Sequence, residues 1–161
     1  IEKCNQSAII ILLVIFYTIL MGDVYMEKKN IDWSNLGFGY MATDYRFVAN
    51  YKDGKWDEGE LITDSNIVMN ECACVLQYSQ TCFEGLKAYT TEDGKIVCFR
   101  PDLNAARLAD SCRGLQMPVF PEDKFVEAVI KTVKANEAYV PPFGSGIGPH
   151  ADRSFAQRTV L

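Results

Sequence analysis

The stretch FEGLKAYTTEDGKIVCFRPDLNAARLADSC, residues 83–112, decides how the chain is expected to fold. Phe83–Thr90 and Ile96–Phe99 are two short strand-like runs, and Asp93-Gly94 lies between them. An Asp-Gly pair between two such runs is a strong signal for a hairpin turn. Pro101 then opens a helix, because proline is tolerated in the first helical turn. This order predicts antiparallel strand pairing rather than parallel crossovers.

A second hairpin is expected upstream of this stretch. Tyr45–Tyr51 (YRFVANY) alternates apolar and polar side chains, which is typical of a half-buried strand. Asp53-Gly54 follows and supplies the turn, and Trp56–Leu61 is the returning strand. The chain therefore offers two antiparallel hairpins before its helical part.

Two helices are expected downstream. The first runs from Pro101 to about Gln116, and the second opens at Pro121 and ends at Pro141-Pro142. Acidic residues at the start of the second helix suit the positive end of the helix dipole. Its apolar stripe recurs at helical spacing and consists of Phe125, Val126, Val129, Ile130 and Val133. Hairpins followed by helices predict an α+β domain, with helices packed on an antiparallel sheet.

Length, charge and cysteine content narrow the class of protein. The 161 residues suit one domain, or one domain with a terminal extension. A net charge of -5 argues against nucleic-acid binding, which needs a basic surface. The six cysteines show no zinc-ligand spacing, and the single histidine, His150, is expected to be solvated. We expect no metal site, no nucleic-acid partner and reduced thiols in the cytoplasm.

Both ends of the chain differ from its middle. Ala8–Met21 (AIIILLVIFYTILM) is apolar but shorter than the roughly 20 residues that span a bilayer. Residues 1–25 are therefore interpreted in two ways: as a membrane tether, or as upstream translation before a start at Met26. Residues 147–161 lack strand or helix periodicity and predict a divergent, disordered tail. The domain is expected to span residues 26–146, with the cytoplasm as its compartment.

No complete catalytic set stands out from the residues themselves. The chain has no second histidine, no Gly-x-Ser-x-Gly elbow and no phosphate-binding glycine loop. Arg107 lies beside apolar residues on the first expected helix, so its cation either reaches water or meets a buried anion. Spacing alone favours water. Gly85, in a strand after an aromatic residue, indicates a bulge or the close approach of another backbone or a ligand.

Five ordered blocks of the sequence cover about three-quarters of the chain. They are TDYRFVANYKDGKWDEGEL (43–61), LQYSQTCFEGLKAY (76–89), FRPDLNAARLADSC (99–112), MPVFPEDKFVEAV (117–129) and ANEAYVPPFGSG (135–146). In order and spacing these blocks resemble branched-chain amino acid aminotransferases, which are fold-type IV enzymes that use pyridoxal 5'-phosphate (PLP). The resemblance implies the small N-terminal domain of such an enzyme.

The resemblance also implies roles for individual residues. Arg107 would bind the phosphate of PLP, which suits the forked geometry of a guanidinium. The pocket for the substrate side chain would be lined by Phe38, Tyr78, Phe83 and Gly85. The implied substrates are leucine, isoleucine or valine, with 2-oxoglutarate as the amino acceptor. The implied assembly is a homodimer.

The resemblance further implies that part of the enzyme is missing. The Schiff-base lysine of the family lies in its second domain, and Lys87 matches a position that is not catalytic. We assign no catalytic residue for this reason. Arg153 and Arg158 do not match the family's carboxylate-binding arginine. We expect a truncated transaminase that is inactive by itself; the alternative is a non-catalytic module that pairs with a full-length aminotransferase subunit.

Overall fold

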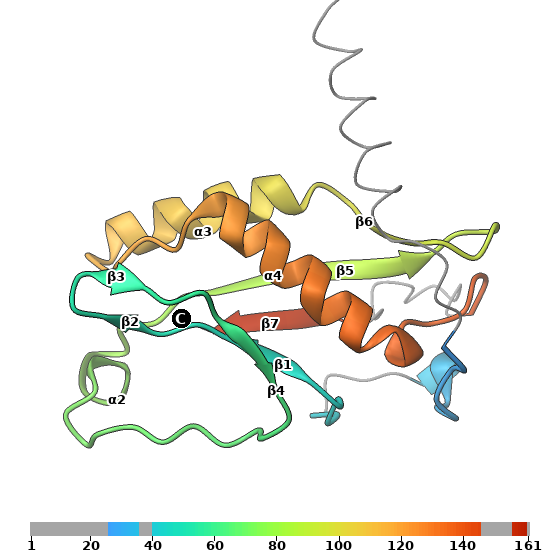
Figure 1. Cartoon of the computed structure of the whole chain (residues 1–161), viewed down its shortest axis with the longest axis horizontal. Coiled ribbons are helices and arrows are strands. Elements are labelled where there is room, and N and C mark those ends of the chain that lie inside the picture. Colours follow the sequence, from blue (N-terminus) through green and yellow to red (C-terminus); the bar gives the residue numbers. More distant parts are fainter. Residues whose placement is uncertain (1–25, 36–39, 146–155, 161) are drawn as a thin grey trace, which may run out of the picture.

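Two helices lie over one face of a three-stranded sheet in the computed structural model (Figure 1). The structure describes residues 26–35, 40–145 and 156–160. The helices are α3 (Pro101–Gly114) and α4 (Glu122–Ala135). The sheet has the order β6-β5-β7 and contains β5 (Phe83–Thr90), β6 (Ile96–Cys98) and β7 (Ala156–Val160). Both pairings are antiparallel, so the predicted α+β class is confirmed.

The core lies between this sheet and the two helices. Leu86 and Ala88 of β5 are buried at alternating positions, as one face of a strand requires. The predicted stripe of α4 faces the same core, with Ile130 half-buried at its border. The buried cluster comprises Leu86, Ala88, Ile96, Ala105, Leu108, Cys112, Phe120, Phe125, Val126, Val129, Val133 and Val140. Burial of this apolar surface is the main stabilising contribution to the domain.

The upstream hairpin forms, but both of its arms are interrupted. Its outer strands are β1 (Arg46–Val48) and β4 (Glu60–Ile62), and its inner strands are β2 (Tyr51–Lys52) and β3 (Lys55–Trp56). The turn residues Asp53 and Gly54 have φ values of 53° and 80°, and positive φ at both positions is typical of a type I′ turn. The predicted turn is confirmed, whereas the two predicted continuous strands are wrong.

A bulge explains the interruption. Residues 49–50 on one arm face residues 57–59 on the other, so the returning arm carries one extra residue. Gly59 adopts a φ of +65°, and a Cβ atom there would lie 2.2 Å from Cζ of Phe47. Only glycine allows both this backbone conformation and this close contact.

Trp56 is one of the side chains that join the hairpin to the helical layer. Trp56 donates a hydrogen bond from Nε1 to the carbonyl oxygen of Val119, at 2.9 Å. The ring centroids of Trp56 and Phe120 lie 4.9 Å apart at an interplanar angle of 82°. This edge-to-face arrangement is a favoured geometry for aromatic pairs. The tip of the hairpin therefore docks on the connection between α3 and α4.

Helix α4 ends earlier than the sequence predicts. It stops at Ala135 rather than at Pro141-Pro142, and a short 3-10 helix, η2 (Glu137–Tyr139), follows. The side chain of Asn136, at the end of α4, is hydrogen-bonded to the backbone of Tyr45. This long-range contact is not visible in a local pattern. Two further short helices were also not predicted: η1 (Trp33–Asn35) and α2 (Cys74–Tyr78).

The prediction of a tail without strands is wrong for residues 156–160. These residues form β7, whose register with β5 runs from Phe83↔Val160 to Lys87↔Ala156. The edge of β5 offers backbone N–H and C=O groups, and an extended segment can pair with them without a distinctive side-chain pattern. The pairing is regular through Gly85, so the interpretation of this glycine as a bulge is also wrong.

In the described part of the chain, no helix combines the length and the apolar character needed to cross a membrane. The apolar run Ala8–Met21 lies outside the described residues. Within the described ranges, no group of three or more His, Cys, Asp or Glu side chains is arranged to hold a metal ion.

Candidate functional site

The candidate site is built where α3 crosses β5. Asn104 and Arg107 are three residues apart on α3 and therefore lie on the same helix face. Arg107 donates from Nε to Oε1 of Glu84 at 2.5 Å, and from Nη2 to Oε2 at 2.6 Å. Asn104 donates from Nδ2 to Oε2 of Glu84 at 2.8 Å and to the carbonyl oxygen of Gly85 at 3.1 Å. Two side chains of one helix thus hold one carboxylate of the strand.

Burial differs strongly between the two charged partners. The side chain of Glu84 is 5% exposed, whereas that of Arg107 is 68% exposed. The hydrogen bonds from Arg107 hold the pKa of Glu84 below its ordinary value, against the opposing effect of burial, and Asn104 adds to the lowering. The same hydrogen bonds raise the pKa of Arg107. Both groups are therefore charged at neutral pH.

The sequence left two environments open for the cation of Arg107, either water or a buried anion. The arginine reaches water and also meets a buried anion, so both alternatives hold together. A guanidinium has five N–H groups, and two of those of Arg107 donate to Glu84. The exposed side of the guanidinium faces solvent, and the carboxylate of Glu84 fixes its plane. The arrangement suits a phosphate or carboxylate that accepts directed hydrogen bonds.

The aromatic residues implied in the substrate pocket lie on exposed surface. Tyr78, at the end of α2, is 82% exposed, and Phe83, at the start of β5, is 70% exposed. Phe83 and Gly85 alternate with Glu84 along β5, so they lie on the opposite face of the strand from the ion pair. Phe38 lies outside the described residues.

Space is left open at Gly85. A Cβ atom built at this position would meet no atom of the described chain within 4 Å. The glycine is therefore not explained by close approach of another described backbone. A ligand beside β5 could approach the strand most closely at this point.

Sequence reasoning missed Glu84 as a member of the site. The alternation along the strand could have shown it, because Glu84 lies on the same face of β5 as the buried residues Leu86 and Ala88. A carboxylate on the buried face of a strand needs a cation or several donors, since an unpaired buried charge is costly. Arg107 on the following helix is such a cation.

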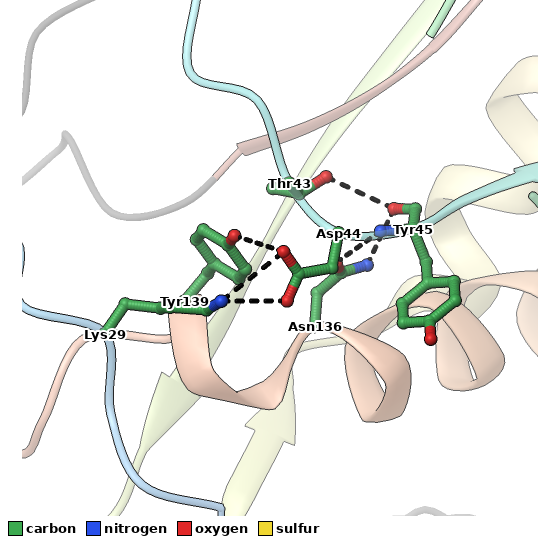
Figure 2. Close-up of polar contacts among 6 residues, drawn as sticks. All are labelled: Lys29, Thr43, Asp44, Tyr45, Asn136 and Tyr139. Atoms are coloured by element: carbon green, nitrogen blue, oxygen red, sulfur yellow. Dashed lines mark hydrogen bonds and ion pairs between the residues drawn. The ribbon is translucent and has the colours of Figure 1, made fainter. Parts of the chain in front are cut away.

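A second polar cluster ties the segment before β1 to the end of α4 (Figure 2). Tyr139 donates from its hydroxyl to Oδ1 of Asp44 at 2.7 Å, and Nζ of Lys29 lies 3.0 Å from Oδ2 of the same carboxylate. The hydrogen bond from Tyr139 is the largest cause that lowers the pKa of Asp44, and Lys29 adds to it. The pKa of Lys29 is raised, chiefly by its hydrogen bond to Asp44.

Asn136 completes this cluster through the backbone. It accepts a hydrogen bond at Oδ1 from the N–H of Tyr45 at 3.0 Å and donates from Nδ2 to the Tyr45 carbonyl at 2.8 Å. Nδ2 also donates to the carbonyl of Thr132 at 2.9 Å, and Thr43 donates from Oγ1 to the Tyr45 carbonyl at 3.2 Å. Figure 2 shows the amide of Asn136 turned toward Tyr45. This cluster is a tether, and its groups bond to one another or to backbone.

Comparison with known proteins shows which proteins have a similar sequence. No family model matches the chain. It is 52% identical over 118 residues to a branched-chain-amino-acid aminotransferase of Haemophilus influenzae. The chain is homologous to branched-chain aminotransferases. It is also 48% identical over 118 residues to the enzyme of that name from Helicobacter pylori, and 43% identical over 121 residues to a methionine aminotransferase of Arabidopsis thaliana.

The match covers most of this chain but a minority of each relative. In the Haemophilus influenzae comparison it covers 73% of this chain and 34% of the aminotransferase. The coverage of the Helicobacter pylori protein is 35%. The chain thus spans about a third of the length of the curated relatives that it matches. The family resemblance inferred from the ordered sequence blocks is confirmed.

Proposed function

We propose that this chain supplies the N-terminal part of a PLP-dependent aminotransferase, with the small-domain fold of fold-type IV enzymes. The proposed reaction moves the amino group of leucine, isoleucine or valine to 2-oxoglutarate. The observation that carries the proposal is the 52% identity over 118 residues to a branched-chain-amino-acid aminotransferase. The ion pair of Arg107 and Glu84 supports it, because it presents an oriented guanidinium to solvent.

Arg107 has the central role in cofactor binding in this proposal. Its exposed N–H groups donate to the phosphate, while Glu84 fixes the plane of the guanidinium and Asn104 holds Glu84. Because Glu84 offsets the charge of Arg107, directed hydrogen bonds contribute more than net attraction. Bound PLP supplies the electron sink that transamination needs. The lysine that completes the reaction is proposed to come from polypeptide beyond the matched third.

Tyr78, Phe83 and Gly85 form the substrate-facing surface in this proposal. The two aromatic side chains are exposed, and Gly85 leaves open space beside β5. A branched aliphatic side chain gains free energy when it leaves water for such an apolar surface. Each methylene contributes only about 1–3 kcal/mol of discrimination. The surface therefore selects for apolar side chains as a class, with finer preference depending on the rest of the pocket.

Complementation tests the proposal directly. The chain is coexpressed with the Haemophilus influenzae aminotransferase from which the homologous segment has been deleted. The expected result is a complex that transaminates leucine with 2-oxoglutarate, whereas neither piece does so alone. Arg107→Met should weaken PLP binding by the complex about 10- to 100-fold, since a hydrogen bond to a charged group contributes about 1.5–3 kcal/mol.

Arg113→Met is the matched control, because Arg113 lies on the same helix and pairs with the exposed Asp110. It should leave PLP binding unchanged. Equal losses from both substitutions would contradict the assignment of Arg107. A complex that forms without any turnover would instead favour a non-catalytic module that pairs with an aminotransferase subunit.

A further inference from the structure

Two thiols from distant parts of the chain meet beside the candidate site. Cys82 immediately precedes β5, and Cys112 lies in the last turns of α3. Their Sγ atoms are 3.7 Å apart, although 30 residues separate them in sequence. Cys82 is half-buried and Cys112 is fully buried, and both are free thiols. The aminotransferase proposal gives neither of them a role.

We propose that Cys82 and Cys112 form a reversible intramolecular disulfide when the folded chain meets a peroxide. The inference does not depend on the proposed function. A disulfide bond is about 2.05 Å long, so the two sulfurs must approach by roughly 1.6 Å. Small side-chain movements can supply that approach. Cys82 reaches solvent, so it meets the oxidant first, and Cys112 lies behind it as the resolving thiol.

The disulfide forms in two steps, through a sulfenic acid on Cys82. The Cys82 thiolate attacks one oxygen of hydrogen peroxide, the O–O bond breaks, and a sulfenic acid and hydroxide form. The Cys112 sulfur then attacks the sulfenic sulfur, the S–O bond breaks, and water leaves with the thiol proton. Two thiols lose two electrons and two protons in total, and one peroxide becomes two waters. A small dithiol reverses the reaction by thiol–disulfide exchange.

The surroundings of Cys82 determine the rate at which its thiol reacts with peroxide. Burial, and secondarily the hydrogen bond with Cys112, raises the pKa of Cys82 to about 11. Only the thiolate is nucleophilic, so the rate should rise about tenfold per pH unit below this pKa. The pair is therefore a slow sensor of sustained oxidation rather than a fast peroxidatic site.

The disulfide would act on the same two elements that build the candidate site. Cys82 is two residues before Glu84, and Cys112 is five residues after Arg107. A covalent link between β5 and α3 would hold the strand carrying Glu84 against the helix carrying Arg107. The oxidised chain should keep this ion pair together under conditions in which the reduced chain loses it.

Peptide mapping tests the proposal in the full chain. A Cys72→Ser/Cys74→Ser variant removes the two exposed thiols near Cys82. The folded variant is treated with hydrogen peroxide at pH 7 and pH 9, alkylated and cleaved with trypsin. Cys82 then falls in the peptide of residues 56–87 and Cys112 in that of residues 108–113. The expected product is a cross-link of these two peptides, lighter by two hydrogen atoms, formed faster at pH 9 and cleaved by dithiothreitol.

Two controls distinguish a disulfide that forms because Cys82 and Cys112 are neighbours from general oxidation of the thiols. Cys98, another partly buried thiol on β6, lies in the peptide of residues 96–107, because trypsin does not cleave before Pro101, and it should join neither partner. A Cys112→Ser variant should leave Cys82 free to oxidise further to sulfinic acid. Cross-linking that is equally frequent with Cys98, or that appears only in urea, would overturn the proposal. So would a Cys82 that reaches sulfinic acid while Cys112 stays reduced, or a pair that stays reduced at pH 9.

Discussion

Two polar clusters of this molecule each join a helix to a strand-forming segment, yet they differ in what they leave exposed. Arg107 and Asn104 join α3 to Glu84 of β5, and the side chain of Arg107 remains 68% exposed. Asn136 joins α4 to the backbone of Tyr45, and it is 1% exposed. The buried Glu84 of the first cluster thus holds a charged side chain in contact with solvent, whereas the buried Asn136 of the second cluster holds only backbone groups. A polar link can therefore serve binding when it combines a buried anchor with an exposed partner.

The largest effect on stability is expected at the buried amide. Asn136→Ala removes the hydrogen bonds to both backbone groups of Tyr45 and leaves an N–H without its acceptor. The free energy of unfolding should fall by about 2–3 kcal/mol. Urea unfolding followed by circular dichroism measures this change. Asn50→Ala is the control, because Asn50 donates a hydrogen bond to the exposed Asp57. An equal loss of stability in both variants would mean that burial of the Asn136 amide adds nothing to its contribution.

The second effect concerns the ion pair. Glu84→Gln keeps the shape of the side chain but removes its charge, so the free energy of unfolding should fall by about 1–2 kcal/mol. A double-mutant cycle with Arg107→Met isolates the coupling of the two charges. The exposed pair Asp110–Arg113, measured in the same way, should show far weaker coupling. Comparable coupling in the two pairs would mean that burial of Glu84 has no energetic consequence.

The third effect is a dependence of stability on pH. The pKa of Glu84 is lower in the folded chain than its ordinary value, so the folded state binds fewer protons than the unfolded state in that range. Its contribution to stability is complete above the ordinary glutamate pKa of about 4.3 and is lost as the pH falls through the lower folded value. Urea midpoints measured from pH 7 to pH 3 should decline less steeply for Glu84→Gln than for the parent chain.

The smallest effect is expected at the ion pair of the second cluster. Lys29 and Asp44 are 44% and 47% exposed, so solvent and salt screen their attraction. Lys29→Met should lower the melting temperature slightly in dilute buffer and not at all in molar salt. Lys131→Met, which breaks a surface pair with Glu127, provides a matched comparison. A salt-independent loss confined to Lys29 would show that this tether depends on its charge more than its exposure suggests.

Local patterns were sufficient to predict the parts of the fold that depend on neighbouring residues. The stripe of α4 and the turn at Asp53-Gly54 follow from helical periodicity and from turn chemistry, and both are confirmed. The break at Gly59 follows from the ring of Phe47 packing against the backbone, which no local pattern contains. Strand β7 likewise depends on the edge of β5 more than on its own sequence.

The candidate site was predictable to a similar extent. The phosphate-binding role of Arg107 rests on the resemblance alone and stays a prediction, whereas the solvated side chain that its spacing favoured is confirmed. Glu84 could have been found from strand parity, but its bond to Arg107 needed the packing of α3 on β5. The exposed positions of Tyr78 and Phe83 could not be predicted, because a pocket depends on every element that surrounds it.

The docking of Trp56 on the helices has a spectroscopic consequence. Its indole is bonded to the carbonyl of Val119 and packed edge-on against Phe120, so its emission depends on contact between the hairpin and the helical layer. The chain has two tryptophans, and Trp33→Phe leaves Trp56 as the single reporter. Fluorescence of that variant would follow hairpin docking in time, while circular dichroism follows the helices. The molecule thus carries its own optical probe for the order in which its layers assemble.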